Sequence, residues 1–238
     1  MMGIQEWFTD PDNWSGAGSI PQQLGYHLGY SLVVLAIAFV IAFPIGIAVG
    51  HTGRGEGVVV GIANAMRALP TLGLLILMVQ LMAPRIHSTL AYVIPALVVL
   101  VLLAIPPILA GTVTGIRGID RETTDAARGI GCTDAQIITR IEVPCAMPSV
   151  LAGVRSATLQ VVATATVMAY VSLQGLGRYI IDGRAVGNYA EMAGGAILVA
   201  LLALVLELLF SFAQARLISP GLSRRETRTG GDPVPLPA

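Results

Sequence analysis

Long uninterrupted apolar stretches dominate this sequence and leave few folds open to it. They cover Leu28–Gly50, Val58–Ala83, Leu90–Ile116, Pro148–Leu173 and Met192–Ala215. Each stretch is long enough to cross the roughly 30 Å of bilayer hydrocarbon as a helix, which takes about 20 residues. None of them alternates apolar and polar residues as membrane barrel strands do. The sequence therefore predicts an all-α polytopic membrane protein with about five transmembrane helices.

The composition points to the same class of protein. Charged residues make up 12% of the chain and hydrophobic residues 55%, whereas a soluble domain carries about 25% charged residues. The formal net charge is zero, so the charge balance favours no nucleic-acid partner. We expect the lipid membrane to surround most of the chain.

The arginines are distributed unevenly between the two sides of the expected membrane domain. The loops on the C-terminal side carry most of them: Arg54, Arg117, Arg121, Arg128, Arg140, Arg216, Arg224, Arg225 and Arg228. The other side carries Arg85, Arg178 and Arg184. Positive charge concentrates in cytoplasmic loops. The distribution therefore predicts a multi-pass protein of the cytoplasmic membrane, with its N-terminus outside and its C-terminus in the cytoplasm.

Three regions follow from this reading. Residues 1–25 are expected to be an extracytoplasmic segment with a short interfacial helix, because Trp7 and its apolar neighbours recur at helical spacing. Ser19–Gln22 resembles a capping box that starts the first long helix, which we expect to remain as an uncleaved anchor. Residues 26–218 form the expected transmembrane domain. Residues 219–238, rich in Arg, Gly and Pro, are expected to be a disordered cytoplasmic tail.

Prolines interrupt two of the apolar stretches. A helix from Glu56 to Ala83 would run for about 42 Å, too long for a simple crossing, and Pro70 is expected to bend it. The next stretch contains Pro95 and the pair Pro106-Pro107, and we expect it to be broken or kinked. Such interruptions survive in a membrane where protein or a water-filled cavity covers the freed backbone groups. They suit a transporter, although plain structural kinks are the alternative interpretation.

Polar residues follow one side of the fourth stretch. Gln160, Thr164, Tyr170 and Gln174 are candidates for lining a pathway or forming a gate. The alternative is that they mediate contacts between helices, where small and hydroxylated residues are common.

Two charged residues, Arg67 and Glu207, lie inside apolar stretches and are further candidates for the pathway or gate. Charges in hydrocarbon are costly and often functional. Arg67 follows Glu56 and Glu207 precedes Arg216, and these two charged residues mark the cytoplasmic ends of their helices. At roughly 1.5 Å per residue, Arg67 and Glu207 each lie about 14–16 Å from that end. One hypothesis is that they form an ion pair between helices. The other is that each reaches water or the interface separately.

A charged, helix-forming insert, residues 117–147, separates the third and fourth stretches. Asp120 can cap a helix that begins at Arg121, and Gly131 is well placed for a left-handed turn. Thr133–Gln136 is a capping-box pattern that starts a second helix, expected to end near Pro144. Two short helices are marginally stable by themselves in water. The insert therefore predicts a docking element for a partner surface.

The spacing within this insert carries a family resemblance. It reads Asp-Ala-Ala at 125–127, three residues, Gly131, nine residues, Ile141, one residue, and Val143-Pro144. This resembles the "EAA" loop of permease subunits of ATP-binding-cassette importers, with Asp in place of Glu and Val in place of Leu. The resemblance implies that the loop couples the chain to an ATPase through a set of six residues. These are Asp125, Ala126, Ala127, Gly131, Ile141 and Pro144.

The resemblance extends over roughly residues 26–220 and implies a fold like that of methionine importers, the type I permease fold. The runs "RALPTLGLLIL", "PPILAGTVTGIRGID", "MPSVLAGVRSA" and "LQGLG" look like the branch that imports glycine betaine, carnitine, choline or proline betaine. That branch and the methionine importers usually carry Gly-Ala-Gly-Gly-Leu-Gly where this chain has Ser172–Gly177. A permease for methionine or another small amino-acid-like solute is therefore the alternative.

The resemblance also implies partners. The chain has no phosphate-binding GxxxxGK[ST] loop, so we expect no enzyme activity and no bound cofactor. ATP and Mg²⁺ would be held by a dimer of separate ATPase subunits. An extracytoplasmic solute-binding protein and a second permease, identical or related, complete the expected assembly. A secondary transporter working alone is the rival hypothesis. The scattered His27, His51 and His87 predict no metal site.

Overall fold

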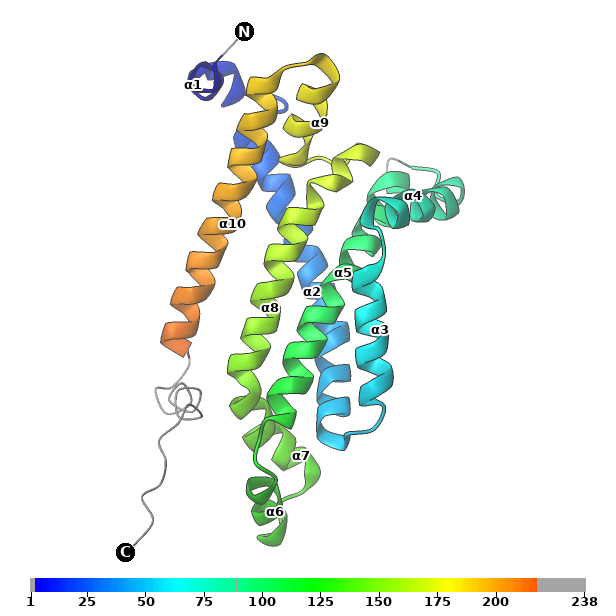
Figure 1. Ribbon diagram of the computed structural model, residues 1–238, viewed down its shortest axis with the longest axis vertical. Helices are drawn as coiled ribbons and strands as arrows, with labels where there is room; N and C mark the ends of the chain where they lie inside the picture. The colour runs from blue at the N-terminus through cyan, green and yellow to red at the C-terminus, as the bar shows by residue number, and fades with distance from the viewer. Residues whose placement is uncertain (1–2, 89, 218–238) are drawn as a thin grey trace, which may run out of the picture.

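The computed structural model describes residues 3–88 and 90–217, and these form helices joined by short loops (Figure 1). Four helices are long and apolar enough to cross a membrane: α2 (Ile20–Thr52), α5 (Leu90–Arg117), α8 (Val143–Ala165) and α10 (Tyr189–Leu217). The shorter helices α3 (Glu56–Ala68) and α4 (Thr71–Met82) follow α2 and provide a further pass. The prediction of an all-α protein with about five transmembrane passes is confirmed.

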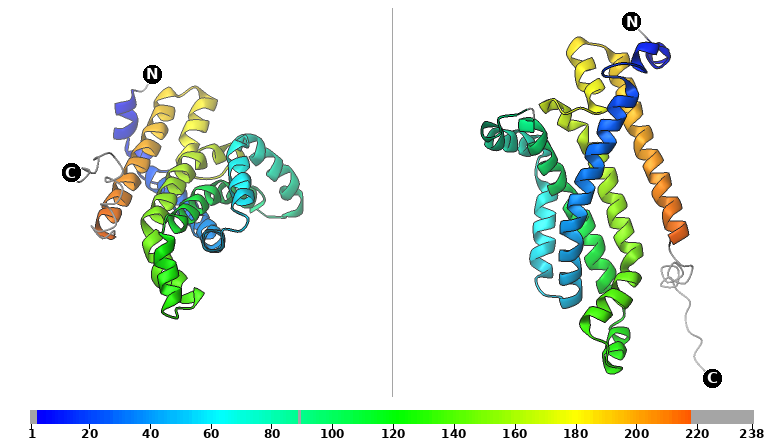
Figure 2. Two further views of the ribbon diagram at one scale, coloured as in Figure 1. Left: turned by 60° about the horizontal axis from the view of Figure 1, so that its bottom comes forward. Right: turned by 180° about the vertical axis from the view of Figure 1, so that it is seen from behind.

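Helix α5 lies at the centre of the bundle, between α2 and α8 (Figures 1 and 2). Residues of all three helices share one apolar core, in which Ala38, Leu100, Ile108 and Val161 are fully buried. Helix α3 packs on α5, and α10 packs on α8 and on the short helix α9 (Gly177–Val186). The two flanking helices therefore lie against different parts of the bundle.

Small residues allow α5 and α8 to touch backbone to backbone. A Cβ atom added at Gly153 would lie 2.7 Å from the carbonyl oxygen of Pro107 and 3.2 Å from the Cα of Gly111. A Cβ atom at Gly111 would lie 2.6 Å from the carbonyl oxygen of Ser149. Lipid gives no hydrophobic drive for helices to associate, so close backbone packing of this kind supplies much of the attraction. The α5–α8 crossing is therefore a closely packed part of the fold that positions the site.

The prolines act differently in the two interrupted stretches. The helix is interrupted at Leu69-Pro70, where α3 ends and α4 begins, and α4 lies across the end of α3 (Figure 1). Helix α5 was expected to be broken or kinked, and the structure excludes the break, because this helix runs continuously through Pro95, Pro106 and Pro107. All three of these prolines are buried. Packing by neighbouring helices therefore holds α5 together where the hydrogen-bond ladder is incomplete.

The fourth apolar stretch ends earlier than the sequence indicates. Helix α8 stops at Ala165, and a 3-10 turn, η4 (Val167–Val171), leads to Ser172 in a left-handed conformation with φ +64°. The chain then enters α9, so residues beyond Ala165 belong to the end of the bundle and not to the helix that crosses it.

The N-terminal residues fold onto the same end as α9. Helix α1 (Ile4–Thr9) and the turn η1 (Pro11–Asn13) precede α2, and the turn η2 (Ala83–Arg85) follows α4. The predicted short helix exists, but Trp7 does not face the headgroups. It is 3% exposed and packs edge-on against Tyr179 of α9, with ring centroids 5.3 Å apart. A Cβ atom at Gly194 of α10 would meet its ring.

Helix α2 begins directly after Ser19, as predicted, but the capping bonds differ from the expected box. The Ser19 hydroxyl makes no capping hydrogen bond, and the Gln22 side chain accepts the N–H of Gly18 at 2.7 Å. The predicted tail, residues 219–238, lies outside the described residues.

Candidate functional site

The charged insert folds as a helix, a glycine turn and a second helix at one end of the bundle (Figure 1). Helix α6 (Arg121–Gly129) starts at Asp120, whose carboxylate accepts the N–H of Glu122 at 3.1 Å. It ends where Gly131 adopts φ +88°. The N–H of Cys132 then donates to the Ala127 carbonyl at 3.0 Å, closing the turn. The predicted cap and glycine turn are both confirmed.

The second helix of the insert continues into the membrane. Helix α7 (Asp134–Ile137) has the predicted capping box, in which Thr133 and Gln136 bind each other's backbone N–H groups. A π-helical turn, η3 (Ile138–Glu142), then leads directly into α8. The prediction that this helix ends near Pro144 is wrong, because Pro144 lies in the first turn of α8. The π turn lies directly before Pro144, and the hydrogen-bond pattern changes there. Pro144 therefore lacks its N–H at a place where the regular pattern is already interrupted, and the helix continues.

The two alanines of the insert point in different directions. Ala127 is 6% exposed and packs within the protein, whereas Asp125 and Ala126 are exposed. Ile130, one helical turn after Ala126, is 84% exposed. The sequence reading missed Ile130, although its spacing from Ala126 is the signal that places both on one side of a helix. The insert therefore presents a small apolar surface, Ala126 and Ile130, on an otherwise polar element.

Charged side chains connect the insert to the end of α2. Arg128 lies 3.2 Å from Asp125 and 3.6 Å from Asp134. The two ring nitrogens of His51, at the end of α2, face Glu142 at 2.8 Å and Asp134 at 3.8 Å. A polar pocket of about 270 Å³ lies beside these residues, between the ends of α2 and α5 and helix α6. The insert is therefore held at this end by polar contacts around a cavity.

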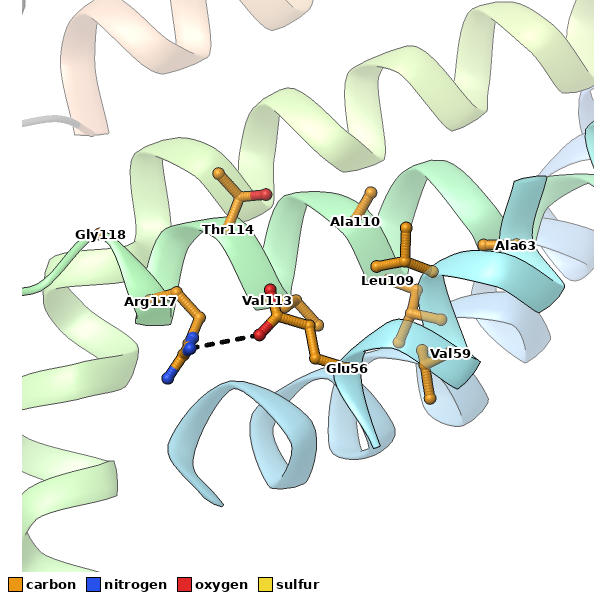
Figure 3. A pocket seen from close by; sticks show the side chains of 10 residues that line it. Glu56, Val59, Ala63, Leu109, Ala110, Val113, Thr114, Arg117 and Gly118 are labelled. Atoms are coloured by element: carbon orange, nitrogen blue, oxygen red, sulfur yellow. Dashed lines mark ion pairs between the residues drawn. The ribbon is translucent and has the colours of Figure 1, made fainter. Parts of the chain in front are cut away.

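A second pocket lies between α3 and α5 at the same end of the bundle (Figure 3). It measures about 420 Å³, and Val59, Leu109 and Val113 make much of its wall apolar. At its mouth Glu56 and Arg117 form an ion pair with a distance of 3.3 Å. This pair ties the start of α3 to the end of α5.

The polar candidates of the fourth stretch do not gather at one place. Gln160 and Thr164 are half-buried and lie one turn apart on α8. Tyr170 is exposed in η4, where its hydroxyl accepts from Arg184 of α9 at 3.0 Å. Gln174 lies in the following loop and accepts from Gln23 of α2 at 2.8 Å. The four residues therefore line no single surface.

Gln174 belongs to a network that fixes the loop after η4 to α2. The Gln23 side chain also accepts the N–H of Gly175 at 2.6 Å. The imidazole of His27 is 2% exposed and binds the Val162 carbonyl at 3.0 Å. Gly175, with φ +134°, lies against this ring, where a Cβ atom would come within 3.1 Å of Nδ1. The loop is therefore shaped by packing on α2.

Tyr179 holds the N-terminal segment against α9. Its hydroxyl donates to the Gly18 carbonyl at 2.7 Å. Burial, with a smaller contribution from the negative charge of Glu191, raises the pKa of Tyr179 to about 12. The phenol therefore stays protonated and remains a donor across the physiological range.

Glu207 pairs with Arg155 of α8, a partner that neither hypothesis had considered. Arg155 Nε donates to Glu207 at 2.8 Å and a terminal nitrogen donates to Gln214 at 3.0 Å, while a second terminal nitrogen contacts Glu207. The side chain of Arg67 lies outside the described part of the chain. The sequence reading overlooked Arg155, although a charge inside the apolar stretch Pro148–Leu173 was a visible signal.

We expect Glu207→Leu to destabilise the protein more than the double variant Arg155→Met/Glu207→Leu. Removing one partner of a buried pair costs about 3–5 kcal/mol. The side chains of Arg155 and Glu207 are 30% and 34% exposed. We therefore expect Glu207→Leu to lower the free energy of unfolding by roughly 1–3 kcal/mol. Thermal unfolding of the purified protein in detergent measures the effect. A double variant as unstable as the sum of the single variants would contradict a direct pair.

Comparison with known proteins places the chain among membrane transport components. Residues 40–224 match the family described as "Binding-protein-dependent transport system inner membrane component". A choline transport system permease protein of Bacillus subtilis is 32% identical over 72% of this chain and 76% of its own length. A carnitine transport permease protein of Listeria monocytogenes is 32% identical over 73% of this chain and 76% of its own. These alignments include the insert and the helices on either side of it.

Two further relatives extend the comparison. A glycine betaine/carnitine/choline transport system permease protein of B. subtilis is 29% identical over 87% of this chain and 93% of its own length. Among solved structures, an inward-facing methionine ABC transporter has a TM-score of 0.76, covering 89% of this chain and 100% of the matched chain. The two chains are 20% identical, so this likeness supports the fold alone.

Proposed function

Because the chain belongs to the family of binding-protein-dependent transport system inner membrane components, we propose that it is the transmembrane subunit of an ATP-driven importer of compatible solutes. The observation that carries the proposal is the insert, a capped helix–turn–helix that presents Ala126 and Ile130 at the arginine-rich end of the bundle. A secondary transporter working alone has no need of such a docking element.

The insert would dock into a cleft of a separate ATPase subunit. Ala126 permits close approach, Asp125 offers a charge-assisted contact, and Ile130 would be the apolar anchor. Gly131 ends the docking helix, while Ile141 and Pro144 lie where the insert joins α8. ATP and Mg²⁺ would bind to the ATPase dimer, and this chain would hold no cofactor of its own. Closure of the two ATPase subunits would then move the permease between its inward-facing and outward-facing states.

The distribution of arginines supports an orientation with the insert in the cytoplasm. Several arginines belong to the elements at that end: Arg54 between α2 and α3, Arg117 at the end of α5, and Arg121, Arg128 and Arg140 in the insert. Arg85, Arg178 and Arg184 lie at the opposite end with α1 and α9. The positive-inside rule favours a cytoplasmic insert and an N-terminus outside. The end formed by α1 and α9 would then face an extracytoplasmic solute-binding protein.

A second permease subunit would complete the pathway, either another copy of this chain or a related one. Helices α3 and α4 expose many large apolar side chains, among them Val58, Ile62 and Leu77. The break between these helices at Leu69-Pro70 leaves backbone groups without helical partners. A protein neighbour or a water-filled path would satisfy these groups, which lipid does not.

The proposed substrates are quaternary ammonium solutes of the choline, carnitine and glycine betaine class. These solutes appear in the names of the relatives. Such cations prefer aromatic surroundings, yet aromatic residues make up 5% of this chain. Most of the recognition would therefore belong to the binding protein. The permease itself would then be less selective than the binding protein.

The test is uptake into proteoliposomes that contain the tagged permease, the ATPase that co-purifies with it, and a solute-binding protein. We expect ATP-dependent uptake of radiolabelled choline, carnitine or glycine betaine, and none with ADP. An ATPase in which the phosphate-loop lysine is replaced should give no uptake and serves as the control. Uptake of methionine with none of the ammonium solutes would overturn the substrate class. Uptake that persists without ATP would overturn the importer.

A further inference from the structure

A buried contact joins the last turn of α2 to the π-helical turn before α8. His51 Nδ1 lies 2.9 and 2.8 Å from the two carboxylate oxygens of Glu142. The two side chains are 12% and 6% exposed. A buried carboxylate is costly unless it is paired and hydrogen-bonded. His51 is the partner that lets Glu142 stay inside the protein, and a proton on Nδ1 is the one that is donated to it.

The other ring nitrogen of His51 faces the second helix of the insert. Nε2 lies 3.8 Å from Asp134, the first residue of α7. The same carboxylate lies 3.6 Å from Arg128 of the docking helix α6. One imidazole is therefore within reach of both ends of the segment that runs from α7 through η3. It stands between the membrane helices and the insert.

The π turn is the place where the insert would bend relative to α8. Its wider hydrogen-bond pattern interrupts the regular helical ladder at Ile138–Glu142, and such turns are frequent at functional sites. The polar pocket of about 270 Å³ lies between the end of α2 and α6. In α6, Ala127 is the buried residue, so apolar packing gives this helix little support. The direction of α6 therefore depends on a direct contact between α2 and η3.

We propose that His51 is a positioning residue that braces the π turn through Glu142, so that force applied to the insert moves α8 and α2 together. This inference rests on the proposed function, in which an ATPase pulls on α6. Without the brace the insert would still dock, because the docking surface at Ala126 and Ile130 is unchanged. The movement would be absorbed by rotation at the π turn and would not reach the membrane helices.

The test separates this role from a purely stabilising one by comparing three variants. His51→Leu strands the buried Glu142 carboxylate and is expected to lower both stability and coupling. The double variant His51→Leu/Glu142→Leu removes the stranded charge, so stability should return while coupling does not. His51→Gln keeps a donor toward Glu142 and should retain most of the coupling.

The measured quantity is solute imported per ATP hydrolysed, in proteoliposomes of the assembled complex. We expect this ratio to fall at least about tenfold in His51→Leu and in the double variant, with the ATPase still bound. A double variant that recovers both stability and coupling would overturn the proposal, because the pair would then act only on stability.

A second measurement does not depend on transport. The full chain, with Cys132 and Cys145 replaced by serine, carries spin labels at Thr123→Cys on α6 and Val58→Cys on α3, both exposed positions. We expect a narrow distance distribution in lipid nanodiscs and a broad one when His51→Leu is added. An unchanged narrow distribution would refute the brace. If His51→Leu broadens the distance distribution but the complex with unsubstituted permease shows no ATP-driven uptake, the importer is refuted and the brace still stands.

Discussion

Replacing Ile130 with aspartate is expected to abolish ATP-driven uptake while the protein stays in the membrane at its normal abundance. Ile130 is 84% exposed, so its removal takes little from the chain's own packing. In the docked complex it would fill an apolar cleft, where one such anchor contributes about 2–4 kcal/mol. Aspartate would add an unpaired charge to the same cleft. A loss of more than about 3 kcal/mol corresponds to a more than hundredfold weaker interaction with the ATPase.

Co-purification of the ATPase with tagged permease, measured alongside uptake, checks this expectation. Thr139→Asp is the matched control, since Thr139 is exposed at the same end but lies in the π turn outside α6. It should retain the ATPase. Ile130→Val shortens the anchor by one methyl group and should cost only a few-fold. If Ile130→Asp retained the ATPase and its uptake, the assignment of the docking surface would be wrong.

Gly153→Leu is expected to prevent the protein from folding. A Cβ atom at this position would lie 2.7 Å from the backbone oxygen of Pro107, and the neighbouring Gly111 leaves no side chain that could move aside. Overpacking usually costs about 1–3 kcal/mol. Here the obstacle is the backbone of the central helix, so α5 and α8 would have to separate and lose the contacts between them. We expect an effect at or above the upper end of that range.

Size-exclusion chromatography of detergent extracts, with a fluorescent tag, would follow this loss of folded protein. Gly29→Leu is the control, because a Cβ atom at Gly29 of α2 would meet nothing within 4 Å. Both substitutions add the same side chain to a membrane helix. A symmetrical peak for Gly153→Leu at the level of the control would show that the α5–α8 crossing adapts, contrary to the packing described above.

The parts of the fold that the sequence predicted are those that local chemistry determines. Apolar length indicated the membrane passes. The caps at Asp120 and Thr133 and the turn at Gly131 depend on residues within a few positions of each other. The caps and the turn appear in the structure where the sequence indicated them, and the number of passes agrees. The family resemblance of the insert agrees with the matched family over residues 40–224.

The parts that the sequence did not predict depend on which helices are neighbours. Counting residues gives the height of Glu207 in the membrane but not the direction in which it points, so Arg155 on α8 was overlooked in favour of Arg67. The continuity of α5 through its prolines depends on burial by other helices. The exposure of Ile130 and the burial of Ala127 likewise depend on how α6 lies against the protein. Periodicity within one segment contains none of this information.

The shortness of α3 makes the bilayer itself a variable in the behaviour of this protein. Thirteen residues, Glu56–Ala68, extend for only about 20 Å, against a hydrocarbon thickness of about 30 Å. Where α3 meets lipid, the membrane must thin or the flanking side chains must reach out to the interface, at a cost of fractions of a kcal/mol per Å of mismatch. A conformational change that alters the height of this face would therefore run at different rates in membranes with short and long acyl chains.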